Sequence, residues 1–108
     1  MFLGALTYFN DAVSGTKQAL KATQALLWNL KLVNTTAAAA YLQFHDKAAA
    51  DVTVGTTTPK FCVRLAANES VNLVFERPIQ FLTAVTIAGT TTATGSTGAA
   101  ISVLAVYE

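Results

Sequence analysis

The residues with the strongest intrinsic chemistry in this chain are a single cysteine, Cys62, and a single histidine, His45. A thiolate beside an imidazole is the core of a cysteine nucleophile, but such sites also need a third group that orients the imidazole. No residue pattern in the chain supplies that group, so we interpret Cys62 as a buried or half-buried strand residue. A lone cysteine also excludes an internal disulfide and a zinc site built from cysteines.

A metal site formed by His45, Asp46 and Asp51 is the second chemical candidate, because imidazole and carboxylate groups both bind divalent cations. Adjacent residues of a strand point to opposite faces, which separates His45 from Asp46. We therefore interpret these three residues as solvated loop residues. The six glycines form neither a G-x-G-x-x-G nor a Walker motif. We predict no catalytic residue, no cofactor, no metal and no enzymatic activity.

The composition is that of one small, nearly neutral domain. The chain has 108 residues, of which 20 are alanine and 16 are threonine, and only 12% are charged, about half the usual fraction. A net charge of +1 excludes a strongly basic nucleic-acid binder. No apolar stretch reaches the roughly 18 residues of a membrane span, and no basic residue precedes the apolar start. We expect no membrane partner and synthesis in a host cytoplasm.

From residue 24 onward the chain alternates apolar and polar residues in runs separated by turn residues, which is typical of strands. The six runs are residues 26–33, 40–46, 59–65, 70–76, a run that begins after Pro78 and reaches Ile87, and 100–107. The alternation places Trp28 in the core with Leu30, and Gln43 and His45 on the outward side. Residues 17–25 contain good helix formers but no capping box, which favours a strand there too.

These runs predict an all-β fold, a single small β-sandwich of jelly-roll or immunoglobulin-like type, over residues 17–108. Residues 47–58 and 89–99 are rich in Gly, Thr and Ser and are predicted to be loops. Both are long for a compact domain, and long loops are often functional.

Residues 1–16 form an N-terminal extension whose apolar side chains lack a clean alternation. These candidate protein-interface residues are Phe2, Leu3, Leu6, Tyr8 and Phe9. One interpretation is an arm that binds a neighbouring protomer or capsid subunit as an added strand. The alternative is an edge strand of the chain's own sandwich.

The order of segments resembles that of small β-sandwich virion proteins of tailed bacteriophages. The similarity runs from about Lys21 to Tyr107 and is carried by residues 30–48, Val54-Gly55-Thr56-Thr57-Thr58-Pro59, Thr86-Ile87-Ala88 and Val103-Leu104-Ala105-Val106-Tyr107. The chain departs from these relatives at Asp51, where they often have proline, and in lacking a glycine near residues 78–82. Both departures fall at turns, where they would alter a loop or the partner that the loop meets.

The resemblance implies a structural component of the virion, most closely a capsid decoration (cement) protein on the capsid surface. Such proteins are commonly trimeric, so we expect a homo-oligomer, with a trimer as the expected state, and the major capsid protein or other virion proteins as partners. Two alternatives remain open. One is another virion part, in the neck, tail or fibre. The other is a carbohydrate-binding sandwich in which Trp28, Tyr41 or Tyr107 would supply a stacking face.

Overall fold

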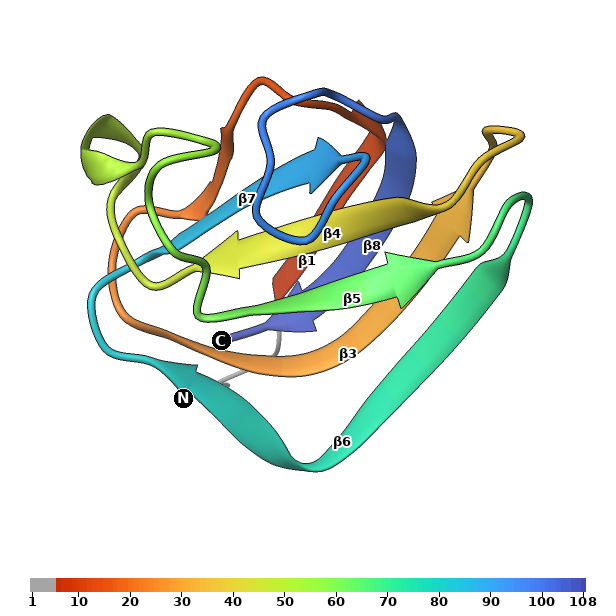
Figure 1. Cartoon of the computed structure of the whole chain (residues 1–108). Helices are drawn as coiled ribbons and strands as arrows, with labels where there is room; N and C mark the ends of the chain where they lie inside the picture. The colour runs from red at the N-terminus through yellow and green to blue at the C-terminus, as the bar shows by residue number, and fades with distance from the viewer. Residues whose placement is uncertain (1–5) are drawn as a thin grey trace.

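The structure, a computed structural model, describes residues 6–108 and is built almost entirely from strands (Figure 1). The elements are β1 (Leu6–Val13), β2 (Gln18–Lys21), β3 (Ala25–Asn34), β4 (Ala40–His45), the 3₁₀ turn η1 (Ala49–Asp51), β5 (Phe61–Leu65), β6 (Ser70–Phe81), β7 (Val85–Thr90) and β8 (Ile101–Tyr107). The prediction of an all-β sandwich is confirmed.

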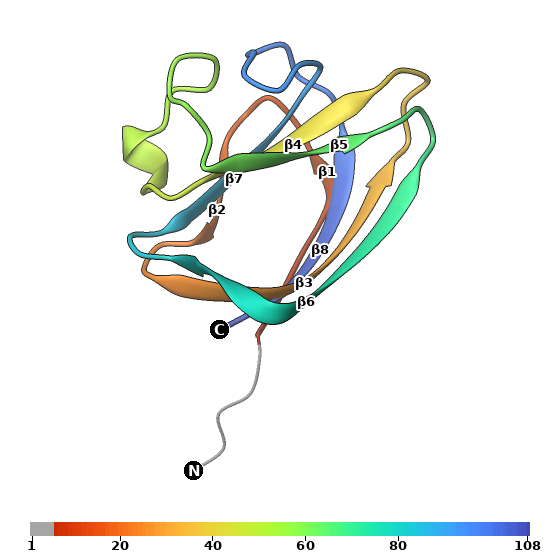
Figure 2. The ribbon, with the colours of Figure 1, turned by 60° about the horizontal axis from the view of Figure 1, so that its bottom comes forward.

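The strands form two antiparallel four-stranded sheets that face each other. Sheet A has the order β1-β8-β3-β6, and sheet B has the order β2-β7-β4-β5. The first strand therefore pairs with the last, and strands adjacent in sequence lie in different sheets, except β4 and β5, which pair with each other (Figure 2). This is the strand order of an eight-stranded jelly roll, the first of the two sandwich types expected.

The core lies between the sheets and is made by alternate residues of the inner strands. On β4, Leu42 and Phe44 are fully buried, and on β8 the same holds for Val103. The Phe44 ring stacks on Phe61 of β5, with centroids 4.6 Å apart. Leu27, Leu30 and Leu32 of β3 complete this layer from the opposite sheet. The period-two pattern of the sequence is therefore the pattern of the core.

One expected core residue, Trp28, is not in the core. Leu27 and Leu30, both buried, lie three positions apart, because a β-bulge between Leu27 and Asn29 shifts the register of β3. A bulge adds one residue to one strand and so reverses the side-chain alternation beyond it. Trp28 is the added residue, and it is only half-buried.

The strand boundary expected at Pro78 is also wrong. β6 continues through Pro78 to Phe81, and the turn falls at residues 82–84 instead. Pro78 has no N–H to donate, but edge strands tolerate proline because one side of their backbone is unpaired. β6 is such an edge strand, and its pairing with β3 is irregular between Val74 and Ile79.

Residues 6–13 form the edge strand β1, the second of the two interpretations of the N-terminal extension. β1 pairs with β8 in regular register from Leu6 to Asn10 and is irregular between Asn10 and Val13. Tyr8 packs against the core, whereas Leu6 and Phe9 are 53% and 64% exposed. Phe2 and Leu3 lie outside the described residues.

Candidate functional site

Cys62 and His45 do not form a nucleophile pair in the structure. Cys62 is half-buried in β5 and lies opposite Gln43 in the β4–β5 ladder. The His45 imidazole is hydrogen-bonded to the Gln43 side chain, with Nε2 3.0 Å from Oε1. The amide of Gln43, not a carboxylate, therefore orients the imidazole, and the thiol takes no part.

The three candidate metal ligands are separated as well. Asp46 accepts hydrogen bonds from the backbone N–H groups of Leu82, Thr83 and Ala84, at 2.8–3.3 Å, and so fixes the β6–β7 turn. Burial would raise the pKa of Asp46, but these bonds and the charge of Lys60 lower it below its ordinary value. Within residues 6–108 no three His, Cys, Asp or Glu side chains are grouped so that they could hold a metal ion.

Sheet B carries a row of polar side chains on its outward side that is completely buried, contrary to the expectation that Gln43 and His45 face solvent. Gln43 Nε2 donates to Thr90 Oγ1 and to the Gly95 carbonyl, at 3.0 and 3.1 Å. Thr86 Oγ1 donates to the Lys47 carbonyl at 2.8 Å. These bonds attach the sheet to the two long loops, residues 46–60 and 91–99, which cover it.

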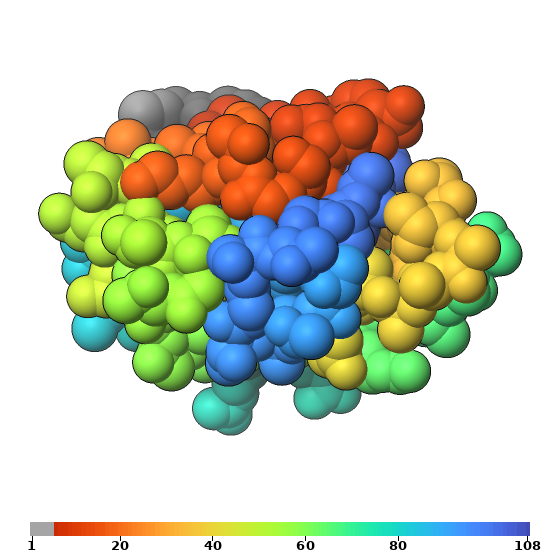
Figure 3. All heavy atoms as spheres, turned by 45° about the horizontal axis from the view of Figure 1, so that its top comes forward, coloured from red at the N-terminus to blue at the C-terminus, as the bar shows by residue number. Residues whose placement is uncertain are grey.

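The two loops also pack against each other (Figure 3). Gly55 has a φ of 94°, and a Cβ at this position would lie 2.7 Å from the Cβ of Ser96 in the other loop. Only glycine combines this backbone conformation with so close an approach. The long loops therefore form a fixed cover over sheet B.

His45 is held in its neutral form by this cover. Because Gln43 Nε2 donates to a carbonyl, its Oε1 must accept from His45 Nε2, and the proton of the neutral ring sits there. His45 Nδ1 is buried without a hydrogen-bond partner. Burial, and then the charge of Lys47, lower the pKa of His45 below its ordinary value of 6.5.

We expect the free energy of unfolding to fall when the pH is lowered below about 6.5. In that range the unfolded chain binds a proton at His45 that the folded chain does not, so acid favours unfolding until the pH reaches the lowered pKa of the folded state. His45 is the only histidine, and the difference between the wild type and a His45 variant in urea denaturation between pH 7.5 and 5 isolates its contribution. The variant His45→Gln should show no such slope; a slope of equal size in both proteins would contradict the assignment.

Sheet A, in contrast, has an outward side that no loop of residues 6–108 covers. We call the outward-pointing residues in the regularly paired parts of its four strands the outer face; they are Thr7, Phe9, Asn29, Lys31, Val33, Ser70, Asn72, Val74, Ser102, Leu104 and Val106. Five of these eleven side chains are apolar and only Lys31 is charged, but the exposed Asp11 of β1 and the exposed Glu76 and Arg77 of β6 border the face. Phe9 and Val74 are 64% and 78% exposed.

An antiparallel sheet that faces water normally alternates apolar-in with polar-out. Leu104 and Val106 break this rule, since they point outward beside the buried Val103 and Ala105. Contiguous apolar surface of this kind marks protein-interaction sites. Sequence reasoning missed these two residues, although the run Val103–Tyr107, apolar at both parities, was the available signal. Of the predicted interface residues, Phe9 lies on the outer face, and Leu6 and Tyr8 lie beside it on β1.

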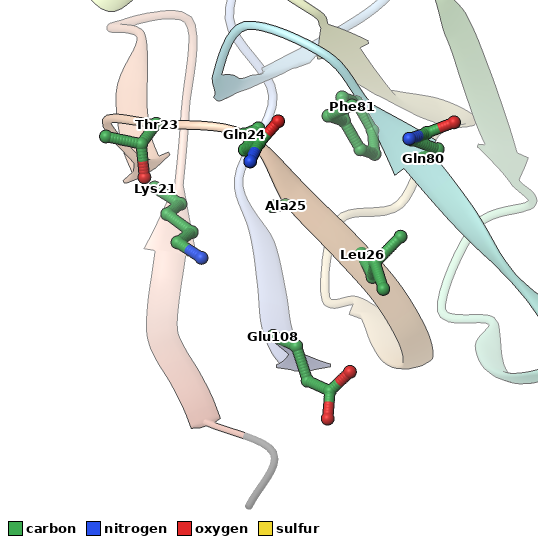
Figure 4. Close-up of a pocket in the computed structure, with 8 residues that line it drawn as sticks. All are labelled: Lys21, Thr23, Gln24, Ala25, Leu26, Gln80, Phe81 and Glu108. Carbon is green, nitrogen blue, oxygen red and sulfur yellow. The ribbon is translucent and has the colours of Figure 1, made fainter. Parts of the chain in front are cut away.

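A separate pocket of about 490 Å³ opens at one end of the sandwich (Figure 4). It is lined by Lys21, Thr23, Gln24, Ala25, Leu26, Gln80, Phe81 and Glu108. The pocket thus combines a cation, a carboxylate and two amides. Trp28 does not line it, but its Nε1–H donates to Oε2 of the lining residue Glu108 at 3.2 Å.

No helix in the described part of the chain is long and apolar enough to cross a membrane. Comparisons of the sequence with protein-family models, and of the chain with curated proteins and solved structures, give no match.

Proposed function

We propose that the chain is a structural protein of a bacteriophage virion, a capsid decoration protein that binds the capsid exterior as a homo-oligomer and has no enzymatic activity. The outer face of sheet A is the observation that carries this proposal. Five of its eleven side chains are apolar, its single charge is Lys31, and charged residues lie at its margins, an arrangement that suits docking onto another protein surface. The resemblance to virion proteins supplies the kind of partner.

The fold is compatible with this proposal but does not select it. Jelly rolls occur in viral capsid proteins and in lectins, and a fold hosts many functions. The difference between the two sheets is more informative. Sheet B is closed by the chain's own loops, whereas sheet A leaves apolar side chains such as Leu104 for a partner to cover.

The proposal is tested by mixing the purified protein with expanded empty capsids of the virus that encodes it. We expect saturable co-sedimentation, because capsids present many identical sites. Leu104→Lys should weaken binding on the order of 100-fold, since it places a charge without a partner in the interface. The matched control Ala67→Lys adds the same charge in the exposed turn between β5 and β6 and should bind normally.

Two results would contradict the decoration role. One is a wild-type protein that remains in the supernatant with capsids but sediments with isolated tails or fibres, which would move it to another virion part. The other is a Leu104→Lys variant that binds capsids as tightly as Ala67→Lys, which would remove the outer face from the interface.

Carbohydrate binding is a second candidate, and the position of Trp28 favours it. The bulge in β3 moves this indole out of the core, where it donates a hydrogen bond to Glu108, a residue of the end pocket. Carboxylate and amide groups next to an aromatic ring can bind sugar hydroxyls and the apolar side of a sugar ring. A glycan array distinguishes the two candidates: binding that is lost in Trp28→Ala supports the pocket, and no binding by the wild type rejects it.

A further inference from the structure

The two sheets have four edge strands, and the chain protects them unequally. Exposed edges invite pairing with other chains, and proteins block them with charges, proline, bulges or short strands. In sheet B, β2 has only four residues and ends at Lys21, with Lys17 just before it. β5 has five residues and carries Arg64, with Lys60 just before it. Both edges of sheet B are therefore short and positively charged.

The edge strand β1 of sheet A is less protected. Its residues 6–10 pair with β8 without a break and contain neither a charge nor a proline. This segment also carries two large apolar side chains that the chain exposes, Leu6 at 53% and Phe9 at 64%. Asp11 and the irregular part of the strand follow only beyond it. The edge of β1 therefore offers a short, apolar segment for pairing.

The opposite edge of sheet A, β6, is blocked more effectively. Its pairing with β3 is irregular beyond Val74, where the strand bends (Figure 1). The bent part carries Glu76, Arg77 and Pro78. The regular part, residues 70–74, exposes one large apolar side chain, that of Val74. Because bends, charges and proline all hinder edge pairing, β1 is the edge of sheet A better suited to it.

The hydrogen bonds of sheet A show which backbone groups of β1 are free. Glu108, directly after β8, exchanges backbone hydrogen bonds with Leu26 of β3. Backbone groups point to alternate sides along an antiparallel strand, so the even-numbered residues of β8 point to β3 and the odd-numbered ones to β1. These odd-numbered residues lie opposite the even-numbered residues of β1. The N–H and C=O groups of Thr7 and Phe9 therefore point away from β8, to the open edge.

Two copies of β1 match each other when a two-fold axis perpendicular to sheet A relates them. If the axis passes beside Tyr8, residues 6–10 of the two copies run antiparallel along their full length. Thr7 of each copy then lies opposite Phe9 of the other, and the free N–H and C=O groups of these residues exchange hydrogen bonds in both directions. The whole uncharged segment is aligned with itself, and Asp11 stays outside it.

The side chains of the paired segments suit each other on both sides of the sheet. On the outer face Phe9 lies opposite Thr7, and an aromatic residue beside a β-branched one is a favourable cross-strand pair. On the inner side the two Tyr8 rings face each other across the axis, and Leu6 lies diagonal to Tyr8 of the other copy. Tyr8 is half-buried and Leu6 is exposed in the single chain, so pairing covers apolar surface that the chain's own core leaves open.

The two-fold arrangement keeps the outer faces of both copies on the same side. Four residues link β1 to β2, so Lys17 and Lys21 lie on the neighbouring edge of sheet B, and their like charges disfavour contact between these edges of the two copies. The copies therefore tilt about the β1 junction, and the joined outer face becomes slightly concave. Because there is only one junction, this face stays open and can dock onto the convex exterior of a capsid.

We propose that two copies of the chain pair antiparallel along β1, with Thr7 of each opposite Phe9 of the other, to form a dimer with one continuous outer face. This inference rests on the homo-oligomer of the proposed function and identifies its interface. It assigns two copies where the resemblance implies three, because a two-fold junction closes at two. The partner is a second copy because the edge of β1 fits itself in direction, register and absence of charge.

Light scattering during size exclusion, over a dilution series, measures this assembly. The wild type should have twice the chain mass of 11.3 kDa. Thr7→Pro should raise the dissociation constant on the order of 100-fold, because it removes an N–H that bonds the partner strand and, by symmetry, removes it twice. Since this N–H points away from β8, the fold of each copy should stay intact.

Asn72→Pro is the matched control at the other edge of sheet A. The Asn34 N–H donates to the Glu69 carbonyl at 2.8 Å, so Glu69 points to β3 and, by alternation, the Asn72 N–H points to the open edge of β6. Asn72→Pro should therefore dimerise as tightly as the wild type. Both variants should keep the circular dichroism spectrum of the wild type.

Disulfide formation tests the register without proline, in chains that also carry Cys62→Ser. Cα atoms of hydrogen-bonded pairs lie about 5.5 Å apart, which a disulfide can bridge, whereas diagonal residues at about 7–8 Å are too far apart. An equal mixture of Thr7→Cys and Phe9→Cys chains should form a covalent dimer under mild oxidation. Either variant alone should not.

A wild type that is monomeric or trimeric would overturn the inference. So would a Thr7→Pro variant that dimerises as tightly as the wild type, a dimer that Asn72→Pro dissociates, which would place the pairing on β6, or a cysteine mixture that does not cross-link. The decoration role fails separately. A dimer that ignores capsids keeps this inference and rejects that role, whereas a monomer that saturates capsids does the reverse.

Discussion

Asn34→Asp is expected to remove most of the stability of this protein at pH 7. Asn34 is fully buried at the end of β3, where its Nδ2 donates to the carbonyl oxygens of Ala38 and Ala66, at 2.9 and 3.0 Å. Its Oδ1 accepts from the backbone N–H and the hydroxyl of Thr36, at 3.0 and 2.7 Å. One side chain thus holds both the β3–β4 turn and the β5–β6 turn.

The aspartate has the same shape but no N–H. It would place a carboxylate oxygen against two carbonyl oxygens. Each carbonyl keeps another donor, the Thr36 hydroxyl for Ala38 and the Glu69 N–H for Ala66, so most of the cost comes from the buried charge without a counter-ion, at about 3–5 kcal/mol. We expect a loss of about 4 kcal/mol or more, from a total of about 5–15 kcal/mol for a domain of this size. Urea denaturation at pH 7 measures it.

Asn34→Ala is the matched control, because it removes the same hydrogen bonds without adding a charge. The carbonyl surroundings should raise the pKa of the introduced carboxyl in the folded state, so its protonation favours folding at low pH. The gap between the two variants should therefore shrink from pH 7 to pH 4.5, and all other titrations cancel in this difference. A constant gap, or an aspartate variant as stable as the wild type, would contradict this role of Asn34.

The strands and the core were predictable because each depends on local alternation. Leu42 and Phe44 on β4, and Ile101 and Val103 on β8, occupy the buried positions that the period-two pattern assigns. Alternation is a property of the strand itself and needs no knowledge of its neighbours. The all-β sandwich followed from this pattern.

Trp28 and Pro78 are the two positions at which the alternation predicts the wrong structure. Alternation predicts the face of a residue only while the register is regular, and a bulge depends on the partner strand. The bulge that displaces Trp28 arises between β3 and its neighbours β6 and β8. Pro78 lies in the same irregular part of β6. Neither could be predicted from one strand taken alone.

The candidate site was predicted in part. Leu6, Tyr8 and Phe9 were singled out as interface residues because they are apolar without alternation; in the structure Leu6 and Phe9 are exposed on β1, whereas Tyr8 packs against the core. Val74 and Leu104 were not singled out, because alternation assigns a side and does not say whether anything covers it. The cover of sheet B was not predicted for the same reason. No residue next to His45 in the sequence indicates that residues 46–60 and 91–99 fold back over it.

Gln43→Leu is expected to release that cover and to lower the free energy of unfolding by about 2–5 kcal/mol, because it leaves buried polar groups on either side unpaired at about 1–3 kcal/mol each. Leucine fills nearly the same space but removes the hydrogen bonds that Gln43 makes to the Gly95 carbonyl and to His45 Nε2. Gln80→Leu makes the same chemical change at an exposed position of β6 and should change the free energy of unfolding by less than about 0.5 kcal/mol.

Hydrogen exchange shows which part of the fold the Gln43→Leu substitution loosens. The Thr91 amide, which donates to the Thr97 carbonyl within the loop at 2.9 Å, should exchange much faster in Gln43→Leu, whereas core amides of β3 and β8 should follow only the global loss. Because Gln43 is the one side chain that joins sheet B, His45 and the loop of residues 91–99, unchanged exchange at Thr91 would mean that the loop is held by its own turn and its contact with Gly55, and not by the buried polar row.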